Sequence, residues 1–223
     1  MGRLSTLGGS EAVDVRFVRE WVQEIAAAVG SQKDYLTQLD AAIGDADHGT
    51  NMDRGFSAVV AKLATADDLL PGNALTTAGM TLISTVGGAA GPLYGTAFRQ
   101  AGRALGDGAN FDAADLLKAL RAGLEGIQSL GAATEGDKTM VDAYAPAVAA
   151  FADVVGNGGE LVDATVRARE AAEDGMRATI PMQARKGRAS YLGPRSVGHQ
   201  DPGATSTALI FSALERVAGR LVP

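Results

Sequence analysis

The sequence predicts an all-α fold, an antiparallel bundle of about eight helices with one long loop. Two observations support this prediction. Apolar residues recur at helical spacing along most of the chain, whereas no stretch alternates apolar and polar residues between hairpin turns as a strand would. Short segments rich in Gly and Pro separate the helical patterns, and short connections place successive helices antiparallel.

The helices can be placed in order along the chain. The first pattern covers residues 13–29, and Ser31 can then cap a second helix. That helix should end near Gly44, with Asp40 in its last turn. The last helix has a strong start signal, because Asp201 can cap it and proline suits its first position. The remaining helical patterns, including the last, cover residues 50–63, 74–85, 92–105, 112–130, 140–155, 160–179 and 202–218.

The composition is typical of a soluble globular protein, with 46% hydrophobic and 21% charged residues. Cysteine is absent, which excludes disulfides and thiolate metal sites and agrees with a reducing cytoplasm. The net charge of −6 disfavours nucleic acid and anionic membranes as partners. Residues 69–98 carry no charge, but prolines interrupt them, so we expect buried helices rather than a membrane span. The N-terminus lacks the apolar core of a signal peptide, so we expect a cytoplasmic protein.

The most informative segment is one short polar run that contains Asp40, Asp45, Asp47 and His48. Crowded carboxylates repel one another unless a positive charge lies between them, and oxygen ligands suit a hard cation such as Mg²⁺. One dication would leave net negative charge on three carboxylates, so a second metal or a cationic group is also expected. The alternative is a solvated turn between helices, because Asp, Gly and Asn favour turns.

Two further segments precede helical patterns. Residues 87–95 are rich in glycine, which lets backbone N–H groups approach an anion; the same glycines could instead allow two helices to pack closely. In residues 136–142, either Asp137 or Thr139 could cap the following helix. We interpret Lys138 between them as an ordinary solvated surface charge.

Residues 181–201 show little helical pattern. A loop of this length in a compact domain is usually a lid or binding loop, or else disordered. It carries basic residues that suit a polyphosphate, because arginine binds phosphate oxygens with two hydrogen bonds; they are Arg185, Lys186, Arg188 and Arg195. No P-loop is present, so a nucleotide would need an all-helical site. We therefore interpret residues 1–223 as one domain, with residues 1–10 flexible and residues 181–201 as the lid.

Together these segments resemble the DhaL family, the nucleotide-binding subunits or domains of dihydroxyacetone kinases. They occur in the order of that family and span most of the chain. With Asp40 ahead of them, the matching segments are GDADHGTNMDRG (residues 44–55), GGAAGPLYG (87–95), GDKTMVD (136–142) and RASYLGPRSVGHQDPGATS (188–206).

The resemblance implies an eight-helix antiparallel barrel, with the nucleotide bound at one end and the long loop folded over it. By analogy with that family, Asp40, Asp45 and Asp47 would hold two Mg²⁺ ions that bridge to the phosphates. The family often has serine at the position of Ala90, so backbone N–H groups would replace one hydroxyl contact. The positions expected near ADP or ATP are His48, Gly49, Thr50, Asn51, Ala89, Ala90, Gly131, Met140, Arg188, Asp201, Pro202 and Gly203.

The resemblance also implies a kinase subunit that relays phosphoryl groups. In the phosphotransferase-system form, Mg-bound ADP accepts a phosphoryl group from a phosphohistidine protein and passes it to dihydroxyacetone, which a histidine holds on a separate subunit. We expect both proteins as partners, and a homodimer is compatible with the sequence. The alternatives are an ATP-exchanging subunit of a ketose or sugar-derivative kinase, and a nucleotide-sensing regulatory module without turnover.

Overall fold

A computed structural model describes residues 12–67 and 69–221 of the chain. The prediction that residues 1–10 are flexible lies outside these described residues. The elements, in chain order, are β1 (Val13–Asp14), α1 (Val15–Ser31), α2 (Lys33–Ile43), α3 (His48–Ala64), α4 (Pro71–Thr85), α5 (Ala90–Leu105), β2 (Asn110–Phe111), α6 (Ala113–Gly131), α7 (Val141–Gly156), α8 (Leu161–Ala178), η1 (Arg188–Ser196), α9 (Pro202–Ala218) and η2 (Gly219–Leu221).

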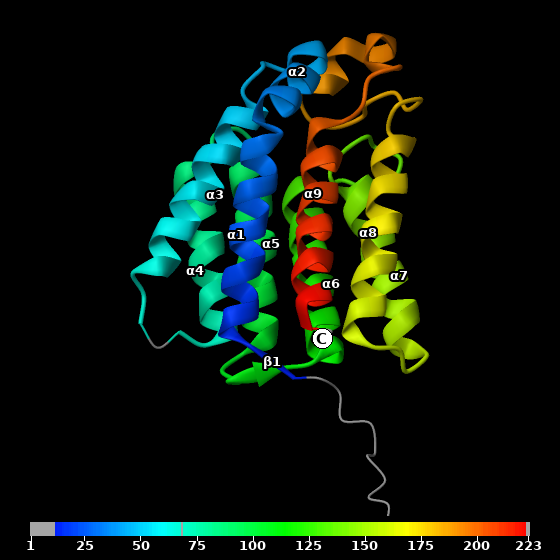
Figure 1. Cartoon of the computed structure of the whole chain (residues 1–223). Helices are drawn as coiled ribbons and strands as arrows, with labels where there is room; N and C mark the ends of the chain where they lie inside the picture. Colours follow the sequence, from blue (N-terminus) through cyan, green and yellow to red (C-terminus); the bar gives the residue numbers. More distant parts are fainter. Residues whose placement is uncertain (1–11, 68, 222–223) are drawn as a thin grey trace, which may run out of the picture.

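Eight helices of the described residues, α1 and α3 to α9, form a closed ring (Figure 1). Each packs against the next in the order α1, α3, α4, α5, α6, α7, α8, α9, and α9 packs back against α1. The shorter helix α2 lies across one end of the ring, next to the 3₁₀ helix η1. Neighbouring helices of the ring run in opposite directions, so the all-α antiparallel barrel predicted from the sequence is confirmed.

Local signals explain where several helices begin. Asp112 and Asp115 form a capping box at the start of α6. Asp201 caps α9 as predicted, since its side chain accepts a hydrogen bond from Ala204 N at 2.7 Å, and a proline occupies the first position of that helix. A proline also begins α4, so this helix starts at Pro71, three residues before the apolar pattern becomes visible.

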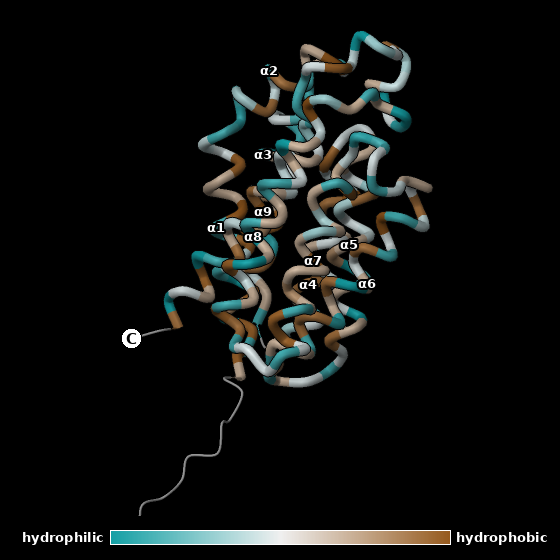
Figure 2. Tube along the Cα trace, turned by 90° about the vertical axis from the view of Figure 1, so that its right-hand side faces the viewer, coloured by the Kyte–Doolittle hydropathy of each residue, from teal (hydrophilic) through white to brown (hydrophobic). Residues whose placement is uncertain are grey.

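The helices bury their apolar faces inside the ring. Trp21 of α1 lies against Phe98 of α5, with 5.6 Å between ring centroids, and Phe98 contacts Phe56 of α3 at 5.9 Å. Tyr144 of α7 packs edge-on against Phe211 of α9 at 5.2 Å. Pairs of this kind add to the stability that area burial provides. Figure 2 shows hydrophobic and hydrophilic residues alternating along the helices, as amphipathic helices require.

Helices α4 and α5 approach each other closely because glycines face one another. A Cβ at Gly79 would lie 2.4 Å from Gly95 O, and a Cβ at Gly95 would lie 2.7 Å from Gly79 O. Gly95 of the glycine-rich segment therefore serves close helix packing. The uncharged residues 69–98 form α4 and much of α5, and within the described residues no helix combines the length and apolarity that crossing a membrane needs.

Three local details differ from the predictions. Ser31 ends α1 and donates to Ala28 O at 2.8 Å instead of capping α2, because α2 follows directly. Strands β1 and β2 form a two-residue antiparallel pair, which is too short to show an alternating pattern. The predicted lid contains the 3₁₀ helix η1, where Gly193 and Pro194 obscure any regular apolar spacing.

Candidate functional site

Four helices of the described residues begin around one cavity at the end of the ring that α2 and the lid cover. Their first residues are His48 of α3, Ala90 of α5, Val141 of α7 and Pro202 of α9, and all line a cavity of about 290 Å³. A helix N-terminus presents unpaired N–H groups and the positive end of the helix dipole. Several such ends around one space favour an anion with several phosphates.

The acidic loop between α2 and α3 lies at the edge of this cavity. Asp40 is buried, and its Oδ2 accepts hydrogen bonds from Asp47 N at 2.9 Å and from His48 N at 3.1 Å. These bonds fold the loop back onto α2. One carboxylate oxygen each of Asp40, Asp45 and Asp47 then lies within 4.8 Å of the others, the one acidic cluster with metal-ligand spacing in the part of the chain that the structure describes.

Two backbone positions shape the acidic loop. Gly44 ends α2 as predicted, and a Cβ there would lie 2.0 Å from Asp40 Oδ1. A side chain at this position would displace the carboxylate. Ala46 adopts a φ of 61°, a left-handed conformation that turns the chain between Asp45 and Asp47. The loop therefore depends on both positions to bring its carboxylates together.

His48 connects the acidic loop to α9 and α5. Its Nε2 lies 3.0 Å from Ser206 Oγ, which lies 2.7 Å from the Tyr94 hydroxyl. Tyr94 also donates to Gly203 O at 2.8 Å. Burial lowers the pKa of His48 despite the opposing effect of the nearby carboxylates, and burial raises the pKa of Tyr94 well above its usual range. A neutral imidazole and a protonated phenol therefore join three helices beneath the cavity.

Asn51 stands beside the glycine-rich loop that precedes α5. Arg54 donates to Asn51 Oδ1 at 2.7 Å and to Thr85 O, at the end of α4, at 2.9 Å. A Cβ at Gly87 would lie 3.2 Å from Asn51 Nδ2, so glycine lets the chain pass close to this amide. Gly88 has a φ of 65°, which turns the chain into α5. This loop lines the cavity, as the anion-binding interpretation of the segment requires.

Lys138 departs most clearly from the sequence-based interpretation. We interpreted it as a solvated surface charge, but it is fully buried and lines the cavity. Its Nζ donates to Thr179 O at 2.6 Å and to His199 O. Burial lowers the pKa of Lys138, while Asp201 and Asp142 oppose that effect. The hydrogen-bond partners of Lys138 lie far away in the sequence, so no local sequence pattern indicates that Lys138 is buried.

Two aspartates shape the loop that carries Lys138. Asp137 accepts a hydrogen bond from Thr134 N at 2.9 Å, and Asp142 accepts one from Thr139 N at 2.7 Å. Thr139 Oγ1 accepts from Val141 N at 3.1 Å, but the cap position of α7 is occupied by Met140. The prediction that Asp137 or Thr139 caps this helix is therefore wrong, because α7 begins one residue after Met140.

The lid packs onto α2 and the acidic loop. Arg188 Nη2 lies 3.0 Å from Asp45 Oδ2, which brings the lid across to the cluster of carboxylates. Because the side chain of Arg188 is 67% exposed, this ion pair contributes little to stability. It does orient the Arg188 side chain toward Asp45. A small apolar cluster joins α2 to the lid through Ile43, Ala184, Ala189 and Leu192.

The structure brings most of the predicted site residues together. Gly49 and Thr50 do not line the cavity: Thr50 is exposed, and a Cβ at Gly49 would lie 2.0 Å from Lys33 O of α2. The predicted residues that do line it are Asp40, Asp45, Asp47, His48, Asn51, Ala89, Ala90, Gly131, Met140, Arg188, Asp201, Pro202 and Gly203. Apolar residues without a predicted role also line the cavity, and they carry no chemical signal in the sequence; they include Leu93, Ile127, Ala133 and Val141.

Comparisons with known proteins agree with this arrangement. The profile of the DAK2 domain matches residues 42–216. The ADP-binding subunit DhaL of the PEP-dependent dihydroxyacetone kinase of Escherichia coli (strain K12) is 45% identical over 198 residues, which cover 89% of this chain and 94% of that protein. The chain belongs to the DhaL family. The ADP-binding subunit DhaL of kinase 1 from Listeria innocua is 42% identical over 201 residues, with 90% and 96% covered.

The DhaL fold also occurs in a solved structure, the dihydroxyacetone kinase of C. freundii in complex with AMP-PNP and Mg²⁺. The two structures superpose with a TM-score of 0.69 at 26% sequence identity. The match covers 97% of this chain and 37% of that kinase, so the DhaL-family chain corresponds to about a third of the larger protein.

The stability of the folded protein depends on whether the Asp201 carboxyl is protonated. Burial raises the pKa of its carboxyl from the ordinary 3.8 to about 7, although the N–H of Ala204 and the charge of Lys138 lower it in part. The folded protein therefore binds the proton more tightly than the unfolded chain does. The stability that this group contributes is present below pH 4 and is lost as the pH rises to about 7.

Asp201→Asn should remove this pH dependence, because asparagine stays neutral and keeps an oxygen that can accept the hydrogen bond from Ala204 N. Relative to the wild type, the variant should gain stability on the order of 1–4 kcal/mol between pH 4 and pH 7. Urea unfolding at several pH values in metal-free buffer measures this difference. Parallel curves for the two proteins would show that the raised pKa is absent.

Proposed function

We propose that this DhaL-family chain binds Mg-ADP in the cavity and acts as the phosphoryl-relay subunit of a dihydroxyacetone kinase. The phosphoryl group would pass from a phosphohistidine protein of the phosphotransferase system to the bound ADP, and then to dihydroxyacetone on a separate subunit. One observation carries the proposal: a cluster of three carboxylates lies beside a cavity that four helix N-termini surround in the described chain. The 45% identity to an ADP-binding DhaL subunit supports the same ligand.

The acidic cluster fits Mg²⁺. Asp40, Asp45 and Asp47 supply oxygen ligands within 4.8 Å of one another, and together they carry more negative charge than one dication balances. We therefore assign two ions to this cluster. These carboxylates would hold Mg²⁺, and the bound metal would supply positive charge that neutralises the charge of a phosphate nearby. The Mg²⁺ in the related C. freundii kinase complex supports this assignment.

The lining of the cavity offers two kinds of chemistry. The starts of α3, α5, α7 and α9 and the glycine-rich loop provide N–H groups that can hold phosphate oxygens. Other lining residues, which include Leu93, Ile127 and Met140, are apolar and suit the flat face of a base. A nucleoside diphosphate needs both kinds of surface.

The lid supplies a cation and a cover. Arg188 already lies beside Asp45, so its positive charge is close to the carboxylates that would hold the metal ions. Phosphoryl transfer depends mainly on positioning and on neutralising charge, and an arginine suits both tasks. A closed lid also keeps water from the reactive phosphate.

The first test is to purify the protein without added nucleotide, denature it, and identify what is released. We expect ADP at about one equivalent with about two Mg²⁺. An empty protein that binds ATP reversibly would instead indicate the ATP-exchanging kinase subunit. Retained nucleotide without transfer to any partner would indicate the sensing module.

Substitution of a carboxylate tests the metal assignment. Asp45→Asn or Asp47→Asn should weaken Mg²⁺-dependent ADP binding at least about tenfold, equal to about 1.4 kcal/mol, because one ligand charge is lost. Calorimetric titration with and without Mg²⁺ measures the effect. Asp163→Asn, on the exposed surface at the far end of α8, is the matched control. Unchanged affinity in both site variants would contradict the assignment.

The role of the lid arginine can be tested with a matched pair. The side chains of Arg188 and Arg167 are 67% and 66% exposed, and each pairs with one carboxylate. Arg188→Ala should slow phosphoryl transfer or weaken nucleotide binding by about tenfold or more, since it removes a charge that faces the phosphates. Arg167→Ala should leave both unchanged. Equal effects in a transfer assay with partner proteins would rule out the lid assignment.

A further inference from the structure

The lid is a loop whose two ends meet. Gly198 N donates to Ile180 O at 2.8 Å, and Asp201 N donates to Thr179 Oγ1 at 3.0 Å. Thr179 caps the end of α8, and Asp201 caps the start of α9. We call these joined segments, residues 179–180 and 198–201, the neck of the lid.

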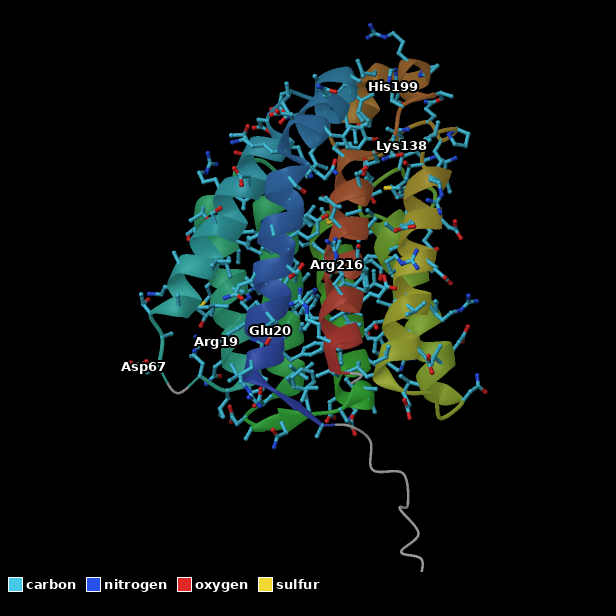
Figure 3. All side chains as sticks on the ribbon, viewed as in Figure 1. Arg19, Glu20, Asp67, Lys138, His199 and Arg216 are labelled. Carbon is cyan, nitrogen blue, oxygen red and sulfur yellow. The ribbon has the colours of Figure 1, made fainter. Side chains whose placement is uncertain are left out.

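Lys138 bonds to both sides of this neck. Its Nζ donates to Thr179 O on one side and to His199 O on the other. Figure 3 shows Lys138 and His199 at the same end of the bundle, where α2 and the lid lie. Lys138 comes from the loop before α7, so a third segment of the chain fastens the neck.

Burial of the Lys138 ammonium group costs free energy, so its partners must compensate for the lost hydration. An ammonium group loses much hydration energy on burial unless it keeps hydrogen-bond partners and nearby negative charge. Two carbonyl oxygens provide the partners, and Asp142 provides nearby negative charge, to which Asp201 adds when it is ionised. The backbone conformation at this position is also uncommon, because Lys138 adopts a left-handed φ of 62°. An apolar residue there would leave Thr179 O and His199 O without this donor.

The neck determines where the tip of the lid lies. Arg188 is at the tip and reaches Asp45, while Lys186, Gly187 and Ala189 beside it line the cavity. Arg185 N donates to Asp137 O at 3.0 Å, which fastens the lid to the residue next to Lys138. Freedom at the neck would therefore move the tip away from the carboxylates.

We infer that Lys138 is a positioning residue that clamps the neck and so holds the arginine-bearing tip of the lid over the cavity. Its effect on nucleotide retention rests on the proposed function. Its effect on the lid itself does not. The two can be measured separately.

Trypsin measures the opening of the lid without any nucleotide. The lid contains Arg185, Lys186, Arg188 and Arg195, and mass spectrometry can assign each cleaved bond. In folded Lys138→Met, cleavage at these bonds should accelerate by about tenfold or more, because two hydrogen bonds to a charged donor are lost. Lys118→Met, whose side chain is 66% exposed on α6, is the control and should match the wild type.

A second variant and a second measurement separate the possible outcomes. Lys138→Gln keeps a shorter, uncharged donor and should show a smaller acceleration. If ADP binds, its dissociation from Lys138→Met should be faster by about tenfold or more, in line with the opening of the lid. Lid cleavage at the wild-type rate in either folded variant would overturn the inference. Loss of folding in both variants would also overturn it, because Lys138 would then support the whole barrel. If lid cleavage accelerates in the variants but the wild type binds no nucleotide, the inference about Lys138 is supported and the proposed function is refuted.

Discussion

The alternating direction of the helices controls the electrostatics of this protein. Because neighbouring helices of the ring are antiparallel, the starts of α3, α5, α7 and α9 meet at one end. Their dipoles favour negative charge there, yet the same end carries the cluster of Asp40, Asp45 and Asp47. A phosphate held by these helix ends would be repelled by the carboxylates unless cations lay between them. This charge pattern is the electrostatic basis for the proposed binding of a metal-bound nucleotide.

A hydrogen-bonded layer separates this site from the apolar core. His48, Ser206 and Tyr94 connect α3, α9 and α5, so the start of each of these helices is tied to the others. Directly below them, aromatic side chains such as Trp21 and Phe98 fill the ring. Well-packed cores change shape little, so this layer gives the cavity a rigid floor. Rigid support suits a reaction that depends on positioning more than on acid or base chemistry.

The lid is held by fewer and weaker contacts than the helices of the barrel. Its contacts with α2 and the acidic loop include a small apolar cluster and one exposed ion pair, both of which contribute modest stability. Segments held by few contacts open more easily than the core, and binding sites commonly use such segments. At the neck, by contrast, the buried ammonium of Lys138 holds the lid through its hydrogen bonds. The neck thus supplies the firm attachment that the exposed contacts at the tip of the lid do not provide.

Much of this protein was predictable from sequence because the signals are local. Helical spacing indicated the helices and their antiparallel order, and the run from Asp40 to His48 indicated a metal site within a few residues. Tertiary structure alone decided the rest. His48 and Ser206 are 158 residues apart, and Lys138 and His199 are 61 apart, so no local pattern could relate them. Lys138 looked like a surface charge because burial depends on which distant segments fold around a residue. The neck of the lid and the cavity with its apolar lining residues exist only once the ring has closed.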